Sequence, residues 1–510
     1  SSVMLFEDIH WSDPTTLEVL DLLIDRVRTM PLLIVLTHRP EFQPKWTGHG
    51  HLMALNLSKL TRAQGIAMVN RLSGSKALPP DLLERIVTKA DGVPLYTEEL
   101  TKSILESGEL KVAGDHYDYA GKARSITIPA TLRDSLMARL DRFMPVKEVA
   151  QIGAAIGREF SYELIAAVAP HIKTELDSAL KQLTESGLAF RRGTPPDATY
   201  VFKHALVQDA AYDSLLKSHR QTLHARIAQV IDQQFPTTKD TAPELLAYHL
   251  TAAGEAEAAI PFWQKAGTLA IQRLALKEAI SHLNQGMEII GTQPHSLERD
   301  GKELDLRTPL GTAWMALKGW TAPEVWASFH PALGLAKSLG RSEALVPIYS
   351  GLWASVITQG RLAEALAWVN EMLASAKAGG DLDLLIVAHS AACTTYYWRG
   401  EFNASREHAA RVLALYNDEK HHHLADIMNV DPKTYVGLYA SLGSWMLGYA
   451  DRAVQESDAK DVNARRRNHP FDTGHALTIG ALLWDSRCEP ERPLARAEGA
   501  ERPGRAHSLP

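Results

Sequence analysis

The first residues of the chain combine an apolar run with two adjacent carboxylates. Residues 3–6 read VMLF, and Glu7 and Asp8 follow directly. A short apolar run of this kind is typical of a buried strand of a parallel sheet. Open α/β sheets bind their ligands beyond the carboxyl ends of such strands. The run therefore predicts a parallel sheet whose first strand presents Glu7 and Asp8 to a binding site.

A second strand follows at the spacing of a βαβ unit. An Asp-Pro pair at residues 13–14 is typical of a helix start, and apolar residues then recur at helical spacing. Residues 32–36 (LLIVL) form a second apolar run, which ends in Thr37 and Arg39. A crossover of this length joins parallel strands, so their carboxyl ends lie side by side. We therefore expect the acid pair, Thr37 and Arg39 to converge on one edge of the sheet.

From residue 60 the apolar pattern becomes helical. Gly92 is a candidate C-cap of one helix, and Pro94 has the preferred residue type for the first position of the next.

Three motifs in this order resemble a known family. They are similar to AAA-related signal-transduction ATPases, in particular to the bacterial group in which such an ATPase follows a class III adenylate/guanylate cyclase domain and precedes tetratricopeptide-like repeats. The motifs are hydrophobic-Glu-Asp-x-His-Trp-x-Asp-x-x-Thr-Leu at 6–17, Thr-x-Arg-Pro-Glu at 37–41 and Asp-Gly-x-Pro-Leu-x-x-Glu-Glu-Leu at 91–100.

The resemblance implies that Glu7 and Asp8 are Walker B acids. Glu7 would then hold Mg²⁺ through water and Asp8 would act as a base or orient the attacking water, although the reverse assignment is also open. From the residues alone, the less favoured alternative is an acidic turn beside a helix.

The same resemblance implies that ATP is the cofactor, together with Mg²⁺. Arg39 would be the first sensor of the terminal phosphate, and Thr37 would lie beside it at the nucleotide. Gly92 and Pro94 would belong to the lid motif that packs near the adenine. The alternative for Arg39 is a surface arginine without a ligand.

A phosphate-binding loop of the form G-x-x-x-x-G-K-[ST] is missing from the sequence. The Gly-Lys pairs at 121–122 and 301–302 lack the hydroxyl residue and the upstream glycine. We therefore expect an internal fragment of a longer protein, which alone binds ATP weakly or not at all and is inactive. By resemblance, the complete protein would be an ATPase with a nucleotidyl cyclase domain further upstream.

Residues 119–236 predict a winged-helix-like module. After a polar linker at 114–124, helices are expected near 130–142, 146–156, 160–168 and 173–186, then a β-hairpin around 194–197 and one long helix over 204–231. The helix before the hairpin carries two lysines against three acidic residues. Such a helix would meet the DNA backbone with repulsion, which disfavours nucleic acid as a partner.

Residues 241–510 predict tetratricopeptide-like helical repeats. Glycines at 360, 400 and 448 each begin a Gly-x-hydrophobic-x-x-small pattern, and Gly319 lies 41 residues before the first of them. A glycine in the turn between two helices, followed by a small residue where they cross, is typical of such repeats. We expect stacked pairs to form a solenoid that binds a protein partner.

Aromatic residues of the repeats have two interpretations. They could line a concave partner surface, or fill the grooves between stacked helices, and the second is the more common arrangement. The residues are Trp353, Tyr396, Tyr397, Trp398 and Trp445.

The overall prediction is a mainly α chain with an N-terminal α/β part. Residues 1–118 would be the C-terminal part of an AAA-type ATPase domain, 119–236 the winged-helix-like module and 241–510 the repeats. Two cysteines, no long apolar run and a net charge of −6 favour a cytoplasmic protein without membrane contact. The function expected is a nucleotide-state switch coupled to a protein-interaction array. The alternatives are a non-catalytic scaffold, or a transcription regulator whose DNA-binding domain lies outside these residues.

Overall fold

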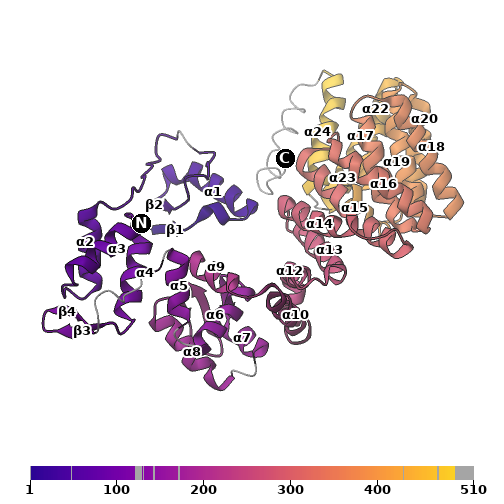
Figure 1. Cartoon of the computed structure of the whole chain (residues 1–510). Helices are drawn as coiled ribbons and strands as arrows, with labels where there is room; N and C mark the ends of the chain where they lie inside the picture. Colours follow the sequence, from indigo (N-terminus) through magenta and orange to yellow (C-terminus); the bar gives the residue numbers. More distant parts are fainter. Residues whose placement is uncertain are drawn as a thin grey trace. The chain divides into compact units, whose positions relative to one another are not determined.

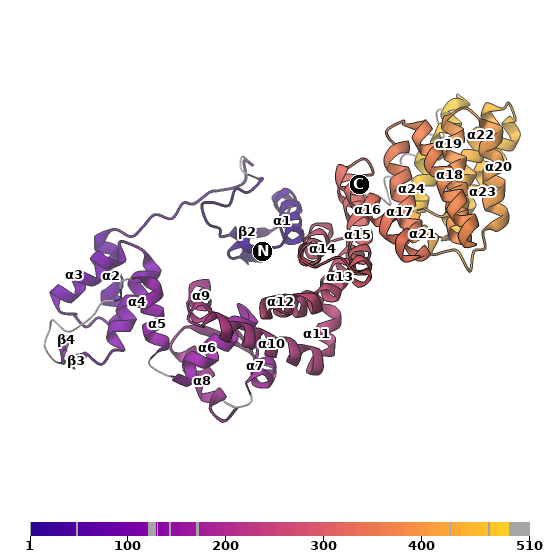
Figure 2. The same ribbon diagram turned by 45° about the vertical axis from the view of Figure 1, so that its right-hand side comes forward.

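The computed structural model describes residues 2–46, 49–120, 129, 131–141, 144–169, 173–428, 430–467 and 470–488. The chain forms two compact units (Figures 1 and 2). The first holds residues 1–12 and 17–262, and the second holds residues 13–16 and 263–510. The predicted start of the repeats at residue 241 therefore falls inside the first unit. No helix in the described ranges has the length and apolarity required to cross a bilayer.

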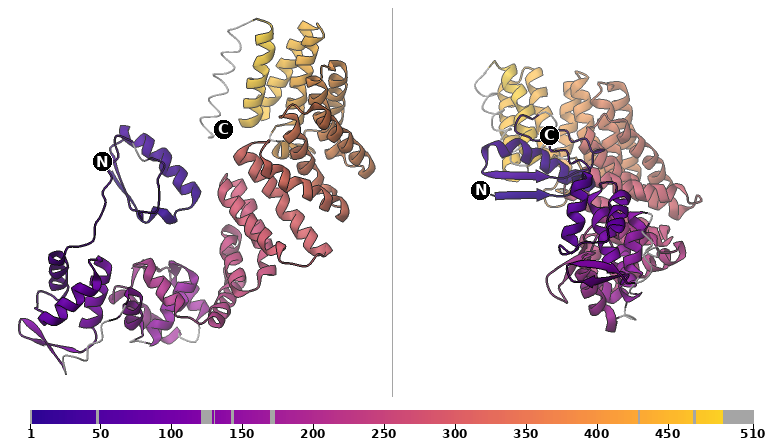
Figure 3. Two further views of the ribbon diagram at one scale, coloured as in Figure 1. Left: turned by 45° about the horizontal axis from the view of Figure 1, so that its top comes forward. Right: turned by 60° about the vertical axis from the view of Figure 1, so that its left-hand side comes forward.

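The N-terminal sheet consists of two parallel strands. Strand β1 (Ser2–Phe6) pairs with β2 (Leu32–Leu36), with Phe6 opposite Leu36, as the βαβ spacing predicts. The 3₁₀ turn η1 (Ile9–Trp11), helix α1 (Pro14–Arg26) and the turn η2 (Val27–Thr29) connect them. Figure 3 shows the two strands side by side, with α1 beside them.

The prediction that these strands are buried is wrong for the described chain. Val3, Leu5 and Leu33 expose 69%, 58% and 59% of their surfaces. Parallel strands are normally covered on both faces. Here the described sheet has two strands, and its small core comprises Ile9, Leu20, Ile24 and Trp46.

A helical group follows, and it ends in a hairpin that the sequence analysis missed. Helices α2 (Arg62–Leu72), α3 (Pro80–Ala90) and α4 (Pro94–Leu105) share one apolar core. Strands β3 (Leu110–Ala113) and β4 (His116–Tyr119) pair antiparallel. Gly114 turns the chain at φ 68°. The polar composition around this two-residue turn led to the incorrect prediction of a linker from residue 114, and residues 121–124 lie outside the described ranges.

The central module resembles its prediction, with one added strand. Its hairpin is extended to three strands in the order β5-β7-β6, because Glu159–Ser161 forms a strand where a helix from residue 160 was expected. The predicted helix over 204–231 is two helices, since the chain breaks at residues 214–216. The elements are α5 (Leu132–Leu140), α6 (Met144–Ile156), β5, α7 (Tyr162–Val168), α8 (Lys173–Glu185), β6 (Ala189–Arg192), β7 (Thr199–Phe202), α9 (Ala205–Asp213) and α10 (Lys217–Gln234). The winged-helix assignment stays a prediction.

Helix α12 (Pro243–Ala253), which follows the short α11 (Pro236–Thr241), packs on α10 through two buried histidines. The Nδ1 atoms of His224 and His249 lie 2.8 Å apart. Burial, reinforced by the neighbouring His224, lowers the pKa of His249 to about 3. The pKa of His224 is also lowered by burial. Both rings are therefore held in the neutral form.

The first unit is therefore expected to lose stability in mild acid. Because the folded pKa of His249 is below the unfolded value of 6.5, its contribution is complete above pH 6.5 and is lost as the pH falls from 6.5 towards 3. At pH 5 the loss is up to about 2 kcal/mol. Urea denaturation gives the free energy of unfolding at pH 7 and at pH 5. The difference between these two free energies should be smaller in His249→Gln than in the wild type, by about this amount. Exposed His219→Gln is the control, and equal pH dependence in both variants would contradict the assignment.

The second unit is a stack of antiparallel helices, visible in pink to yellow in the left view of Figure 3. From α14 to α20 each helix packs on the next, and α20, α22, α23 and α24 continue the stack, as the repeat prediction requires. The helices are α13 (Ala256–Gln272), which belongs to this unit from residue 263 on, α14 (Leu276–Gly291), α15 (Leu297–Lys318), α16 (Pro323–Leu339), η5 (Ser342–Ala344), α17 (Leu345–Ile357), α18 (Leu362–Gly379), α19 (Leu382–Trp398), α20 (Phe402–Leu415), α21 (Leu424–Met428), α22 (Pro432–Met446), α23 (Ala450–Arg467) and α24 (Pro470–Ser486).

The glycine pattern marks the turn inside each helix pair, as predicted. Gly319, Gly360, Gly400 and Gly448 adopt φ between 73° and 88°, a range that residues with a Cβ rarely adopt. They lie between α15 and α16, α17 and α18, α19 and α20, and α22 and α23. The small residues five positions after the last three glycines, Ala365, Ser405 and Ala453, are fully buried. The Gly-x-hydrophobic-x-x-small pattern therefore indicates where the two helices of a pair cross closely.

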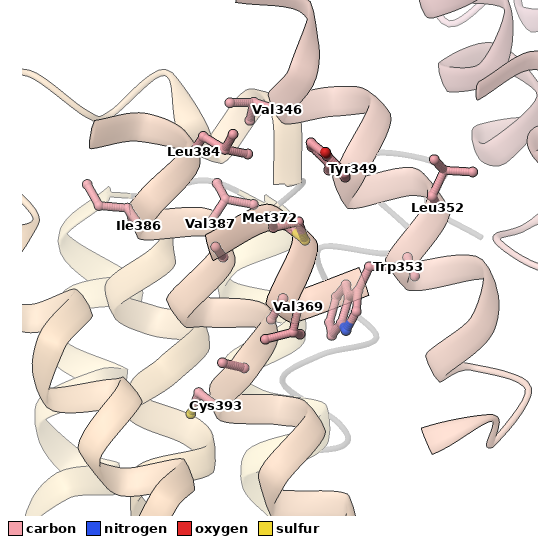
Figure 4. Close-up of a cluster of buried hydrophobic side chains, with 14 of the residues drawn as sticks. Val346, Tyr349, Leu352, Trp353, Val369, Met372, Leu384, Ile386, Val387 and Cys393 are labelled. Atoms are coloured by element: carbon pink, nitrogen blue, oxygen red, sulfur yellow. The ribbon is translucent and has the colours of Figure 1, made fainter. Parts of the chain in front are cut away.

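The core of the repeats runs through successive pairs. Figure 4 shows side chains of α17, α18 and α19 meeting in it, with Trp353 beside Val369. The Trp353 indole donates a hydrogen bond to Thr395 Oγ1 at 3.0 Å. Tyr396, Tyr397 and Trp445 pack against this core, which supports the core interpretation for these aromatics. Trp398 is 54% exposed, so the core interpretation does not hold for this residue.

Candidate functional site

The carboxyl ends of β1 and β2 bring the predicted acid pair and the Thr37 segment together. Thr37 N–H donates to Phe6 O at 3.0 Å, and Ile9 N–H donates to Thr37 O at 3.0 Å. The Thr37 hydroxyl accepts the Asp8 N–H at 2.9 Å. Thr37 thus shapes the turn that carries the acids. The expected contact between Thr37 and a nucleotide is not tested by this geometry.

Asp8 leaves the strand in an unusual backbone conformation. Its φ and ψ are 57° and 42°, in the left-handed region, where aspartate is better tolerated than most residues with a Cβ. This conformation turns the chain sharply into η1, which carries His10 and Trp11. Glu7 remains exposed at the strand end. The chain therefore turns directly after Glu7, at Asp8.

Asp8, Trp11, Arg39 and Arg158 form a cluster, called here the Trp11 cluster. The guanidinium carbons of Arg39 and Arg158 each lie 5.2 Å from the centre of the Trp11 ring. Arg158 also forms an ion pair with Asp8, with 3.2 Å between Nη2 and Oδ2. About 40% of each charged side chain of the pair is exposed. The aromatic face of Trp11 thus gathers two cations beside the Asp8 carboxylate, as cation–π attraction favours.

Sequence reasoning found Asp8 and Arg39 but not Arg158. Arg158 lies in the turn between α6 and β5, 150 residues from Asp8. The only nearby signal is its position in a Gly-Arg-Glu-Phe segment, and no spacing rule connects that segment to the first strand. Trp11 was part of a sequence motif only, and the structure shows that it is 49% exposed and contacts two guanidinium groups.

The side chains of the Trp11 cluster and Glu7 are of types that could bind phosphate and Mg²⁺. Two guanidinium groups can bind phosphate oxygens, and Mg²⁺ in nucleotide sites commonly uses one or two carboxylates plus phosphate oxygens. In the described residues no three His, Cys, Asp or Glu side chains gather at metal-binding distance. A magnesium ion at Glu7 or Asp8 would therefore depend on phosphate and water for its other ligands.

Gly92 and Pro94 belong to the helical group instead. Asp91 and Gly92 are both left-handed, with φ 47° and 70°, and the C-cap of α3 is Asp91, one residue before the predicted glycine. A Cβ on Gly92 would lie 2.5 Å from Leu60 O, and Leu60 N–H donates to Gly92 O at 2.8 Å. Pro94 begins α4 as predicted. No hydrogen bond or ion pair in the described ranges joins either residue to the acid pair, so the lid role stays a prediction.

A buried charge network connects α4 to the central module. Arg139 of α5 bonds Glu99 and forms two 3.0 Å hydrogen bonds with Glu106, and it donates to Ser186 O at 2.6 Å. Nearby, Glu98 pairs with Lys102 and Lys203. Although burial opposes it, these hydrogen bonds lower the pKa of Glu98 to about 2. The predicted lid helix is thus held to the module by ionised side chains.

Comparison with known proteins gives a partial picture. No protein-family model matches the chain. An uncharacterized protein of Rhizobium meliloti (strain 1021) is 28% identical over 357 residues, which cover 69% of this chain and 34% of that protein. The chain thus spans about a third of the length of this relative.

Two solved structures are similar to this chain, at low sequence identity. One is a signal transduction ATPase with numerous domains and a tetratricopeptide repeat sensor from Pyrococcus horikoshii, with 13% identity and a TM-score of 0.38, covering 100% of this chain and 75% of that one. The other is aspartyl phosphate phosphatase F from Bacillus subtilis, with 11% identity and a TM-score of 0.39, covering 88% and 96%. At these scores neither structure assigns a function to this chain.

Proposed function

We propose that the chain is part of a signal-transduction ATPase in which the nucleotide state of the N-terminal segment is coupled to a helical-repeat array that binds a protein partner. ATP and Mg²⁺ are the cofactors, with Glu7 at the metal through water, Asp8 as the base or water-orienting group and Arg39 at the terminal phosphate. The observation that carries the proposal is the Trp11 cluster, in which the acid-bearing end of β1 meets two arginines. By resemblance, the complete protein also carries a nucleotidyl cyclase domain, and its compartment is the cytoplasm.

The Asp8–Arg158 ion pair suggests how nucleotide binding is coupled to the position of the central module. Arg158 belongs to the central module, and that module is bound to α4 through Arg139. A bound Mg²⁺–nucleotide would compete for the Asp8 carboxylate and for the guanidinium groups, so binding would release or reposition Arg158. Reciprocal linkage then requires that a partner which moves the module changes the nucleotide affinity by the same factor.

The Asp8→Asn substitution in the full-length protein tests the proposal. Turnover of ATP is expected to fall by about 10²-fold or more, because a general base or water-orienting carboxylate contributes on this scale. Binding of the nucleotide is expected to persist, since asparagine keeps the size of the side chain. Steady-state phosphate release and fluorescent-nucleotide titration separate the two effects. Asp21→Asn on α1 removes the same charge away from the cluster and should leave both unchanged. Turnover unaffected by Asp8→Asn would remove Asp8 from the mechanism.

A further inference from the structure

A cavity of about 640 Å³ lies within the second unit. We call it the array cavity. Most of its wall comes from the first helices of successive pairs, α15, α17, α19 and α22, with contributions from α21 and α24. Its volume is within the range of sites for small organic molecules. The cavity belongs to one unit and is separate from the Trp11 cluster.

The wall of the array cavity is apolar, aromatic and uncharged. No Asp, Glu, Lys or Arg is among the described residues that line it, while Trp353, Trp398, Tyr435 and Tyr439 supply aromatic surface. Transfer of an ionised group into such a wall without a partner is strongly unfavourable. The cavity therefore selects against charged ligands, including nucleotides and free phosphate.

Two polar atoms of the wall lack hydrogen-bond partners among the described residues. Ser350 Oγ and His475 Nε2 are buried and unpaired. Burial, with Lys460 adding to it, lowers the pKa of His475 to about 4, so its ring is neutral near pH 7. The ring stacks on Tyr435, with centroids 5.6 Å apart. Buried polar atoms are normally paired, so these two atoms provide hydrogen-bonding capacity for a ligand.

We propose that the array cavity binds an uncharged small molecule with an aromatic or alicyclic body and a hydroxyl or carbonyl group. The body lies against Trp353, Trp398 and Tyr439, and the polar group bonds His475 or Ser350. Because the wall comes from four helix pairs, a bound molecule contacts all of them and stabilises one arrangement of the repeats. This inference does not depend on the proposed ATPase function, since it concerns only binding within the second unit.

Three matched probes test the ligand class by equilibrium dialysis against the full chain. They are 2-naphthol, 2-methylnaphthalene and naphthalene-2-sulfonate. We expect saturable binding of one 2-naphthol per chain, about fivefold tighter than 2-methylnaphthalene because of one net hydrogen bond. The sulfonate should bind at least about tenfold more weakly than 2-naphthol. Saturable binding of none of the probes, or equal binding of the sulfonate, would overturn the proposal.

Matched variants test the place of binding. Trp398 lines the array cavity but is 54% exposed, so Trp398→Ala should preserve the fold and weaken 2-naphthol about fivefold or more. Trp326, 38% exposed and outside the lining, is the control, and Trp326→Ala should change nothing. The double variant His475→Leu/Ser350→Ala should bind 2-naphthol and 2-methylnaphthalene equally. Identical effects of the two tryptophan variants, or a hydroxyl preference that survives the double variant, would overturn the assignment.

Discussion

Replacing Arg139 with methionine is expected to destabilise the first unit by about 3–5 kcal/mol. The side chains of Arg139 and Glu99 are each only 1% exposed, so the substitution leaves a buried carboxylate without its cation. It also removes both hydrogen bonds to Glu106 and the donor to Ser186 O. Urea denaturation gives the free energy, and hydrogen exchange of peptides from α4 and α5 shows where protection is lost.

The control variants separate a buried charge from an exposed one. Lys181 pairs with Glu185 with 72% and 66% of the side chains exposed, so Lys181→Met should cost less than about 1 kcal/mol. The double variant Arg139→Met/Glu99→Leu should recover a large part of the loss, because no uncompensated buried charge at position 99 remains. A loss below about 1 kcal/mol in Arg139→Met would show that the network does not hold α4 to the module.

Phe329→Ala is expected to destabilise the second unit by about 3–5 kcal/mol, the range for truncating a fully buried phenylalanine. The ring of Phe329 on α16 lies between two glycines. A Cβ on Gly311 of α15 would come within 2.7 Å of the ring, and one on Gly351 of α17 within 2.3 Å. Three helices therefore pack on one ring, and its removal leaves a cavity that the helix backbones cannot easily close. The loss should appear in urea denaturation of the second unit.

Two further variants check this interpretation. Tyr449→Ala removes an aromatic ring that is 57% exposed, and should cost less than about 1 kcal/mol. Gly351→Ala should destabilise the wild type by about 1–3 kcal/mol through overpacking, and less in a Phe329→Leu background, where the shorter side chain leaves room. Equal effects of Gly351→Ala in both backgrounds would contradict the ring-between-glycines geometry.

Local patterns of the sequence predicted a large part of the secondary structure. The spacing of the two apolar runs predicted parallel strands with Asp8 and Thr37 at the same edge, and these residues are hydrogen-bonded. Polar residues around a two-residue turn concealed the β3–β4 hairpin, and a break at residues 214–216 divided a helix predicted as continuous. Side-chain periodicity identifies whether a segment is a helix or a strand. The residues at which the segment begins and ends depend on turn geometry, which only a few residues determine.

The sequence by itself determined the two apolar runs with their acid pair and the glycines that end the first helix of each repeat pair, because these depend on residues close together in the chain. Only the tertiary structure decided that Arg158 pairs with Asp8 across 150 positions, and that residues from 312 to 475 enclose one uncharged cavity. It also showed the exposure of β1, which an apolar run cannot reveal because burial depends on what covers the sheet. Contacts between residues far apart in the sequence depend on how whole helices and strands pack. The spacing of neighbouring residues therefore cannot predict them.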